Sequence, residues 1–146
     1  MNKAVQWPSY SDKLSDQNEG NTHLTVKEGS EYAGQHLILD IWGAENLNNL
    51  ELIEQCFLES IQAANATLLH IHLHHFIQGD GVSGVAVLAE SHISIHTWPE
   101  KNYAAFDVFM CGQTSPMNVI PIILKAFKAK KHKLTAILRG DMAARI

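Results

Sequence analysis

The sequence contains no apolar run long enough to cross a membrane, although 46% of its 146 residues are hydrophobic. A helix that spans a bilayer needs about 20 consecutive apolar residues. Only two cysteines, Cys56 and Cys111, are present, so a disulfide framework is excluded. The first residues also lack the apolar segment of a signal peptide. We therefore expect a cytoplasmic protein with free thiols and no membrane partner.

Clustered positive charge is scarce as well. The chain has 11 Lys and Arg residues against 15 Asp and Glu, a formal net charge of −4. The one basic cluster, at residues 125–133, is typical of the end of a helix, where the helix dipole favours positive charge. Nucleic-acid binding needs a concentrated basic surface, so no nucleic-acid partner is expected. The chain is long enough for one domain, and its site must lie within that core or across a subunit interface.

Composition divides the chain into two parts. Residues 1–33 are rich in Ser, Asp, Asn, Glu and Gly and show no sustained hydrophobic period. We expect this part to be a loosely ordered N-terminal arm. Residues 34–146 are expected to form the single folded domain.

Hydrophobic periodicity predicts the elements of that domain. Residues 50–61 carry apolar side chains at helical spacing, with Asn48 as the predicted cap, and a second helix is predicted after Ser115. Strands are predicted at residues 36–44, 66–76, 81–90, 92–100, 103–112 and 132–140. The order β-α-β-β-β-β-α-β favours an α+β fold, a two-layer sandwich with a mainly antiparallel sheet and two helices on one face.

The most informative segment is residues 81–112, GVSGVAVLAESHISIHTWPEKNYAAFDVFMCG. It closely resembles the bacterial S-adenosylmethionine decarboxylase proenzymes, which are pyruvoyl-dependent enzymes of the short prokaryotic type. The resemblance extends over residues 34–141 and is most specific in ESHISIHTWPE and in YAAFDVF followed one residue later by CG. It leaves the N-terminal arm uncovered.

The resemblance implies that the chain cleaves itself between Glu90 and Ser91, giving residues 1–90 and 91–146. The resemblance implies that Ser91 then becomes a pyruvoyl group: its hydroxyl converts the preceding amide to an ester, elimination leaves dehydroalanine, and hydrolysis of that group yields the ketone. That ketone forms a Schiff base with S-adenosylmethionine and accepts the electrons released with carbon dioxide. The product is the aminopropyl donor for spermidine synthesis. The resemblance also implies a homodimer of cleaved protomers.

Further catalytic roles follow from motif positions. His96 matches the family's processing acid/base, Ser83 a serine that assists processing, and Cys111 the proton donor of the decarboxylation. An imidazole suits the processing step because its ordinary pKa lies near neutrality. Residues an odd number apart on a strand face opposite sides, so Ser91 and His96 meet only if Ser91 lies in the turn or a bulge intervenes. We expect Ser91 in the turn.

Three residues are candidates for substrate binding. A sulfonium beside an adenosine favours aromatic contacts, and Phe76 matches a family aromatic near the nucleoside, with Trp98 as a second candidate. Glu100 is suited to accept hydrogen bonds from the ribose. Two departures from the family bear on pocket shape: Met110 replaces a smaller polar residue, and QGDGVSG holds one residue more than some relatives.

Three alternatives remain open. A pyruvoyl-dependent decarboxylase of arginine or ornithine fits the same motif, since the motif specifies the cofactor more firmly than the pocket. The histidines of residues 70–74 project from one strand face and suggest a metal-binding module, but no Cys or carboxylate cluster completes a ligand set, so no metal is expected. A hydrolase triad of Ser91, His96 and Asp107 is least favoured, because GVSG lacks the nucleophile-elbow spacing.

Overall fold

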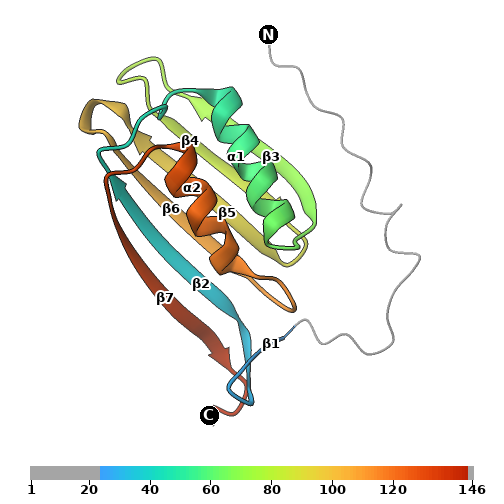
Figure 1. Ribbon diagram of the computed structural model, residues 1–146. Coiled ribbons are helices and arrows are strands. Elements are labelled where there is room, and N and C mark those ends of the chain that lie inside the picture. Colours follow the sequence, from blue (N-terminus) through green and yellow to red (C-terminus); the bar gives the residue numbers. More distant parts are fainter. Residues whose placement is uncertain (1–23, 145–146) are drawn as a thin grey trace.

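The computed structural model describes residues 24–144, which form one layer of sheet and one layer of helices (Figure 1). The elements are β1 (Thr25–Lys27), β2 (Ser30–Trp42), α1 (Leu50–Ala63), β3 (Leu68–His75), β4 (Val82–Leu88), β5 (Ser91–Trp98), the 3₁₀ helix η2 (Pro99–Lys101), β6 (Tyr103–Met110), the 3₁₀ helix η3 (Pro116–Asn118), α2 (Val119–Ala126) and β7 (Lys131–Asp141). The predicted α+β sandwich is confirmed, and the predicted order of elements is present with β1 added before it.

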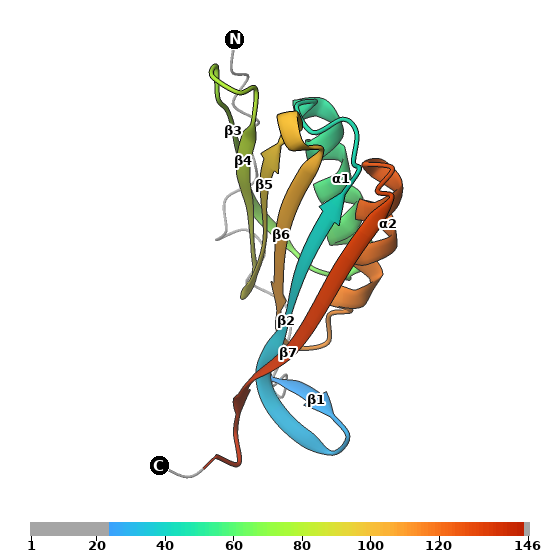
Figure 2. The ribbon, with the colours of Figure 1, turned by 90° about the vertical axis from the view of Figure 1, so that its left-hand side faces the viewer.

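Every strand pairing in the described sheet is antiparallel. Strands β3, β4, β5 and β6 follow one another across the sheet, β2 lies beside β6, and β7 completes the far edge by pairing with β2. Both helices lie on one face, and within residues 24–144 no helix or strand covers the other (Figure 2). We call that uncovered side the open face. No described helix is long and apolar enough to span a membrane.

The core lies between the helices and the sheet, because alternate strand residues face the helix layer. β2 contributes three fully buried side chains, Leu37, Leu39 and Ile41, and α1 buries residues at helical spacing from Ile53 to Ile61. Phe57, Phe106 and Phe127 are among its largest fully buried side chains. The remaining strand residues, histidines prominent among them, point to the open face.

Two helix starts differ from the prediction. Asn49, rather than Asn48, caps α1, since its side chain accepts a hydrogen bond from the Leu52 N–H at 3.1 Å. α2 begins at Val119, because Ser115 and Pro116 lead into η3 instead. Pro121 is therefore the third residue of α2, where a backbone N–H has no acceptor within the helix, so the proline is tolerated.

The predicted N-terminal arm is only partly within the described chain. Residues 1–23 lie outside it. From Thr25 the chain already pairs in the sheet as β1, and β2 begins at Ser30, so regular structure starts before the predicted boundary at residue 34.

Candidate active site

Ser91 is the first residue of β5 and follows the two-residue turn from β4. Its neighbour Glu90 has φ 61°, in the left-handed region that is strained for a residue with a Cβ atom. Ser91 pairs with Leu88, so its side chain points toward the helix layer and is 7% exposed. Its Oγ accepts a hydrogen bond from the backbone N–H of Cys111 at 3.2 Å. The structure thus brings the predicted cleavage residue and the predicted proton donor together.

Cys111 follows β6 and is partly buried. Burial, with a smaller contribution from the Glu90 carboxylate, raises the pKa of its thiol above the ordinary value. The thiol therefore keeps its proton at neutral pH. A group in that state acts as an acid rather than as a nucleophile.

Ser83 and His96 form a second association on the open face. They are directly opposite each other on β4 and β5, and Ser83 Oγ lies 2.9 Å from His96 Nδ1. Because the register of this strand pair fixes both positions, the hydrogen bond orients the imidazole.

The same end of the open face contains a cavity of ≈ 280 Å³. Its lining residues include all three predicted substrate-binding residues together with the Ser83 and His96 pair. Phe76 and Trp98 are about half exposed, and Phe76 packs edge-on against His74 with ring centroids 4.5 Å apart. The cavity therefore offers two aromatic faces and the Glu100 carboxylate, the chemistry expected for a nucleoside.

The expected contact between Ser91 and His96 is absent from the single chain, and the prediction that Ser91 lies in the turn is wrong. Ser91 is one residue past the turn and faces the helix layer, whereas His96 faces the open side. They are five positions apart on β5, about 16 Å of strand. The candidate residues thus form two groups: a cleavage group of Glu90, Ser91 and Cys111, and a pocket group of Phe76, Ser83, His96, Trp98 and Glu100.

A further polar cluster on the open face was missed by sequence reasoning. His36 Nε2 lies 2.8 Å from Asp107 Oδ1, and Arg139 stacks over Phe109 at 5.3 Å. Burial lowers the pKa of the adjacent His92 imidazole, and the positive charges of His36 and Arg139 add to the effect against the opposing Asp107 carboxylate. Only strand register places these groups together, so alternation within one strand cannot reveal them. Asp107 is thus paired away from His96, and the hydrolase triad does not assemble.

The histidines of β3 alternate outward as predicted, with residues 70, 72 and 74 exposed. Over residues 24–144, however, no three His, Cys, Asp or Glu side chains are placed to hold a metal ion. The metal-binding module has no ligand set in the described chain.

Comparison with known proteins identifies the family. The family model described as S-adenosylmethionine decarboxylase matches residues 35–140. The chain is similar to S-adenosylmethionine decarboxylase proenzymes of Methanococcus maripaludis, at 48% identity over 73% of this chain and 89% of the relative, and of Thermomicrobium roseum, at 41% over 73% and 93%. A crystal structure of the adenosylmethionine decarboxylase from Aquifex aeolicus VF5 is 31% identical, with a TM-score of 0.66 over 73% of this chain and 90% of that one. The chain belongs to the S-adenosylmethionine decarboxylase family.

Proposed function

We propose that this protein is a self-cleaving decarboxylase of S-adenosylmethionine, with a pyruvoyl cofactor made from Ser91. Family membership supports the reaction and substrate, and the observation that carries the cofactor assignment is the setting of Ser91. The residue directly follows the left-handed Glu90, and its hydroxyl is held by the Cys111 N–H. The decarboxylated product supplies aminopropyl groups for polyamine synthesis, and two free cysteines are consistent with a cytoplasmic setting.

Self-cleavage begins at the strained turn. Ser91 Oγ attacks the carbonyl carbon of Glu90, and the amide becomes an ester, which relieves the constraint on the Glu90 backbone. Removal of the Ser91 α proton then expels the Glu90 carboxylate and leaves dehydroalanine. Water converts this group to a ketone with release of ammonia. Each step uses atoms of residues 90 and 91 and one water molecule, so the fold has only to hold the turn and supply a base.

Decarboxylation needs an electron sink and an acid. The pyruvoyl carbonyl supplies the sink for the electrons released with carbon dioxide. Cys111, which contacts Ser91 through its backbone and carries its proton at neutral pH, delivers that proton to the α carbon of the substrate. Phe76 and Trp98 bind the adenosine and the sulfonium, and Glu100 accepts hydrogen bonds from the ribose.

The separation of the two groups favours a homodimer formed through the open face. That face leaves Val87, Trp98 and Ile137 each about 40% exposed, which is apolar surface that a second sheet would bury. A two-fold axis across it sets the residue-91 end of one sheet against the pocket group of the other, and symmetry then forms two identical sites. In this dimer the partner's His96 acts as the acid/base in the processing of Ser91 of the first chain, and the partner's Ser83 assists.

Mass spectrometry of the purified protein tests the cleavage. We expect two fragments, residues 1–90 and 91–146, the second beginning with a pyruvoyl group, and carbon dioxide released from S-adenosylmethionine but not from arginine or ornithine. Ser91→Ala should remain whole, whereas Ser94→Ala, a serine on the same strand, should cleave normally. A wild-type chain that stays intact after native folding, or whose new end is unmodified serine, would overturn the proposal.

A further inference from the structure

One wall of the cavity is a short loop between β3 and β4. Residues 76–81, which we call the pocket loop, contribute Phe76, Gln78, Gly79 and Gly81 to the lining. A backbone hydrogen bond from the Phe76 N–H to the Gly81 carbonyl at 2.8 Å closes its base. Two consecutive residues, Gly79 and Asp80, have positive φ. The position of the Phe76 and Gln78 side chains therefore depends on how the tip of this loop is held.

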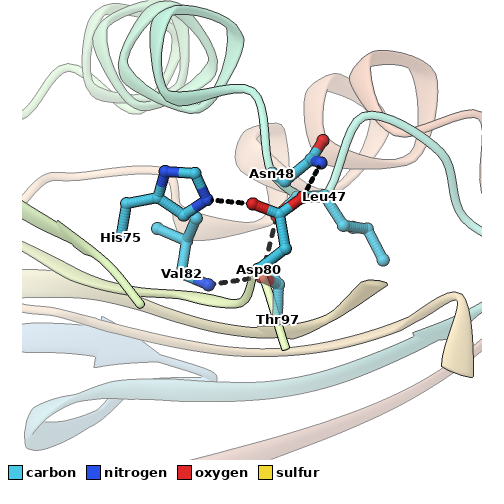
Figure 3. Close-up of polar contacts among 6 residues, drawn as sticks. All are labelled: Leu47, Asn48, His75, Asp80, Val82 and Thr97. Carbon is cyan, nitrogen blue, oxygen red and sulfur yellow. Dashed lines mark hydrogen bonds and ion pairs between the residues drawn. The ribbon is translucent and has the colours of Figure 1, made fainter. Parts of the chain in front are cut away.

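The tip is held by the carboxylate of Asp80, which lies between two side chains (Figure 3). One oxygen contacts His75 Nε2 at the end of β3. The other accepts a hydrogen bond from the Asn48 side chain, which comes from the segment before α1 and is 32 residues away in sequence. These two hydrogen bonds, that of Asn48 first, lower the pKa of the Asp80 carboxyl, so it is an ionised acceptor at neutral pH.

The start of β4 is tied to the same segment by a buried hydroxyl. Thr97 Oγ1 accepts a hydrogen bond from the Val82 N–H at 2.8 Å and donates one to the Leu47 carbonyl at 2.7 Å. Thr97 is 6% exposed, so this tie is shielded from water. Residues 47 and 48 thus anchor both the base and the tip of the pocket loop (Figure 3). The contact at the base is buried, and the contact at the tip is exposed.

We infer that Asp80, held by Asn48 and His75, is a positioning residue that sets the affinity of the cavity for the substrate by fixing the pocket loop. Asp80 is not among the lining residues, so it acts through Phe76 and Gln78. Its hydrogen-bond partners are Asn48 and His75, not Ser83 or His96, so we expect self-cleavage and the chemical step to be unchanged. The inference rests on the proposed function, because the ligand in question is the substrate of that reaction.

Steady-state kinetics of three variants test the inference. Asp80→Gly removes the carboxylate while keeping the left-handed backbone accessible, Asn48→Ala removes one donor, and Asp80→Asn keeps an acceptor for Asn48. We expect KM for S-adenosylmethionine to rise about two- to fivefold in the first two, the range expected for an exposed charge-assisted contact. The KM of Asp80→Asn should lie between theirs and that of wild type. The KM of the double variant, Asn48→Ala with Asp80→Gly, should equal that of Asp80→Gly alone. kcat and self-cleavage should stay at wild-type values.

Glu28→Gly is the matched control. Glu28 is also an exposed acidic residue with positive φ, 51°, but it lies in the turn between β1 and β2. Its replacement should leave KM unchanged. An unchanged KM in Asp80→Gly overturns the inference, and so does a loss of self-cleavage or a fall in kcat in that variant, because either would assign Asp80 to the fold or to the chemistry.

Amide hydrogen exchange separates this inference from the proposed function. Exchange at residues 76–81 should be faster in Asp80→Gly than in wild type, while residues 28–30 exchange equally in both. This measurement needs no substrate. If exchange at residues 76–81 is the same in Asp80→Gly and wild type, the positioning role of Asp80 is overturned even in an active enzyme. A wild-type protein without decarboxylase activity would instead overturn the proposed function, whatever the exchange shows.

Discussion

The two ends of β5 are built in opposite ways. At one end Ser91 is buried, faces the helix layer and follows a strained turn, and at the other His96 and Trp98 are exposed beside a cavity on the open face. The first end suits a reaction of the chain on itself, since the serine is held in one place and water is limited. The second suits a small molecule that must enter and leave. Under the proposed function each chain contributes two half-sites, and the proposed homodimer joins them.

Disrupting the proposed dimer should have the largest effect, because it separates the two ends of β5 that act together. Val87 lies on the open face opposite His92 and is 41% exposed, so Val87→Lys puts a positive charge where the second sheet would pack. We expect a monomer on sedimentation analysis and no self-cleavage on gels. Val26→Lys, on β1 and 61% exposed, should stay dimeric and cleave. A Val87→Lys monomer that cleaves at the wild-type rate would show that one chain holds a complete site.

Removing the acid of the cleavage group should affect chemistry alone. Cys111→Ser replaces the thiol with a much weaker acid, so we expect kcat to fall about 10²- to 10⁴-fold while the chain still divides after residue 90. Cys56→Ala is the control, because Cys56 lies in the core and burial raises the pKa of its thiol to about 12. That variant should lose thermal stability but keep kcat. A Cys111→Ser enzyme with normal kcat contradicts the assigned role.

Changing an aromatic residue of the pocket group, rather than Ser83 or His96, should affect binding alone. Phe76→Ala removes one of the two aromatic faces of the cavity, and we expect KM for S-adenosylmethionine to rise about tenfold with self-cleavage unchanged. Ile77→Ala, at a neighbouring residue whose side chain is fully exposed, should leave KM near wild type. Equal effects of the two substitutions would argue that the loop, rather than the Phe76 ring, contacts the substrate.

The smallest expected effect concerns the pH dependence of stability near the cleavage group. Because the pKa of His92 is lowered in the folded protein, the folded state binds fewer protons than the unfolded state as pH falls through the ordinary value of 6.5. The free energy of unfolding should therefore decrease with falling pH in this range. Urea midpoints at pH about 7.5 and about 5.5 should differ less for His92→Asn than for wild type. An equal or larger difference in the variant would contradict the shifted pKa.

Sequence reasoning reached what is local and missed what depends on register. Alternation predicted the strands and the outward histidines, because one face of the sheet is buried and the other is not. β1 was not predicted because three residues are too few to show a hydrophobic period. The N-cap of α1 was predicted one residue too early because Asn48 and Asn49 are equally good capping residues.

The site was predicted as a set of residues but not as an arrangement. Spacing in one strand suggested that Ser91 and His96 face opposite sides of the sheet. We nevertheless expected Ser91 to lie in the turn and so to meet His96 of the same chain. The pairing of Ser83 with His96, the hydrogen bond of His36 with Asp107, and the contact of Asn48 with Asp80 all join residues from different elements. Such contacts follow from tertiary packing, which no single segment encodes.

Complementation between two inactive variants tests the shared site most directly. Chains carrying Ser91→Ala and chains carrying His96→Asn are each expected to remain uncleaved and inactive when expressed alone. In the mixed dimer, Ser91 of the His96→Asn chain meets the intact His96 of its partner, so coexpression should restore cleavage of the His96→Asn chain alone, together with release of carbon dioxide. Mixed dimers in which neither chain is cleaved would contradict the account.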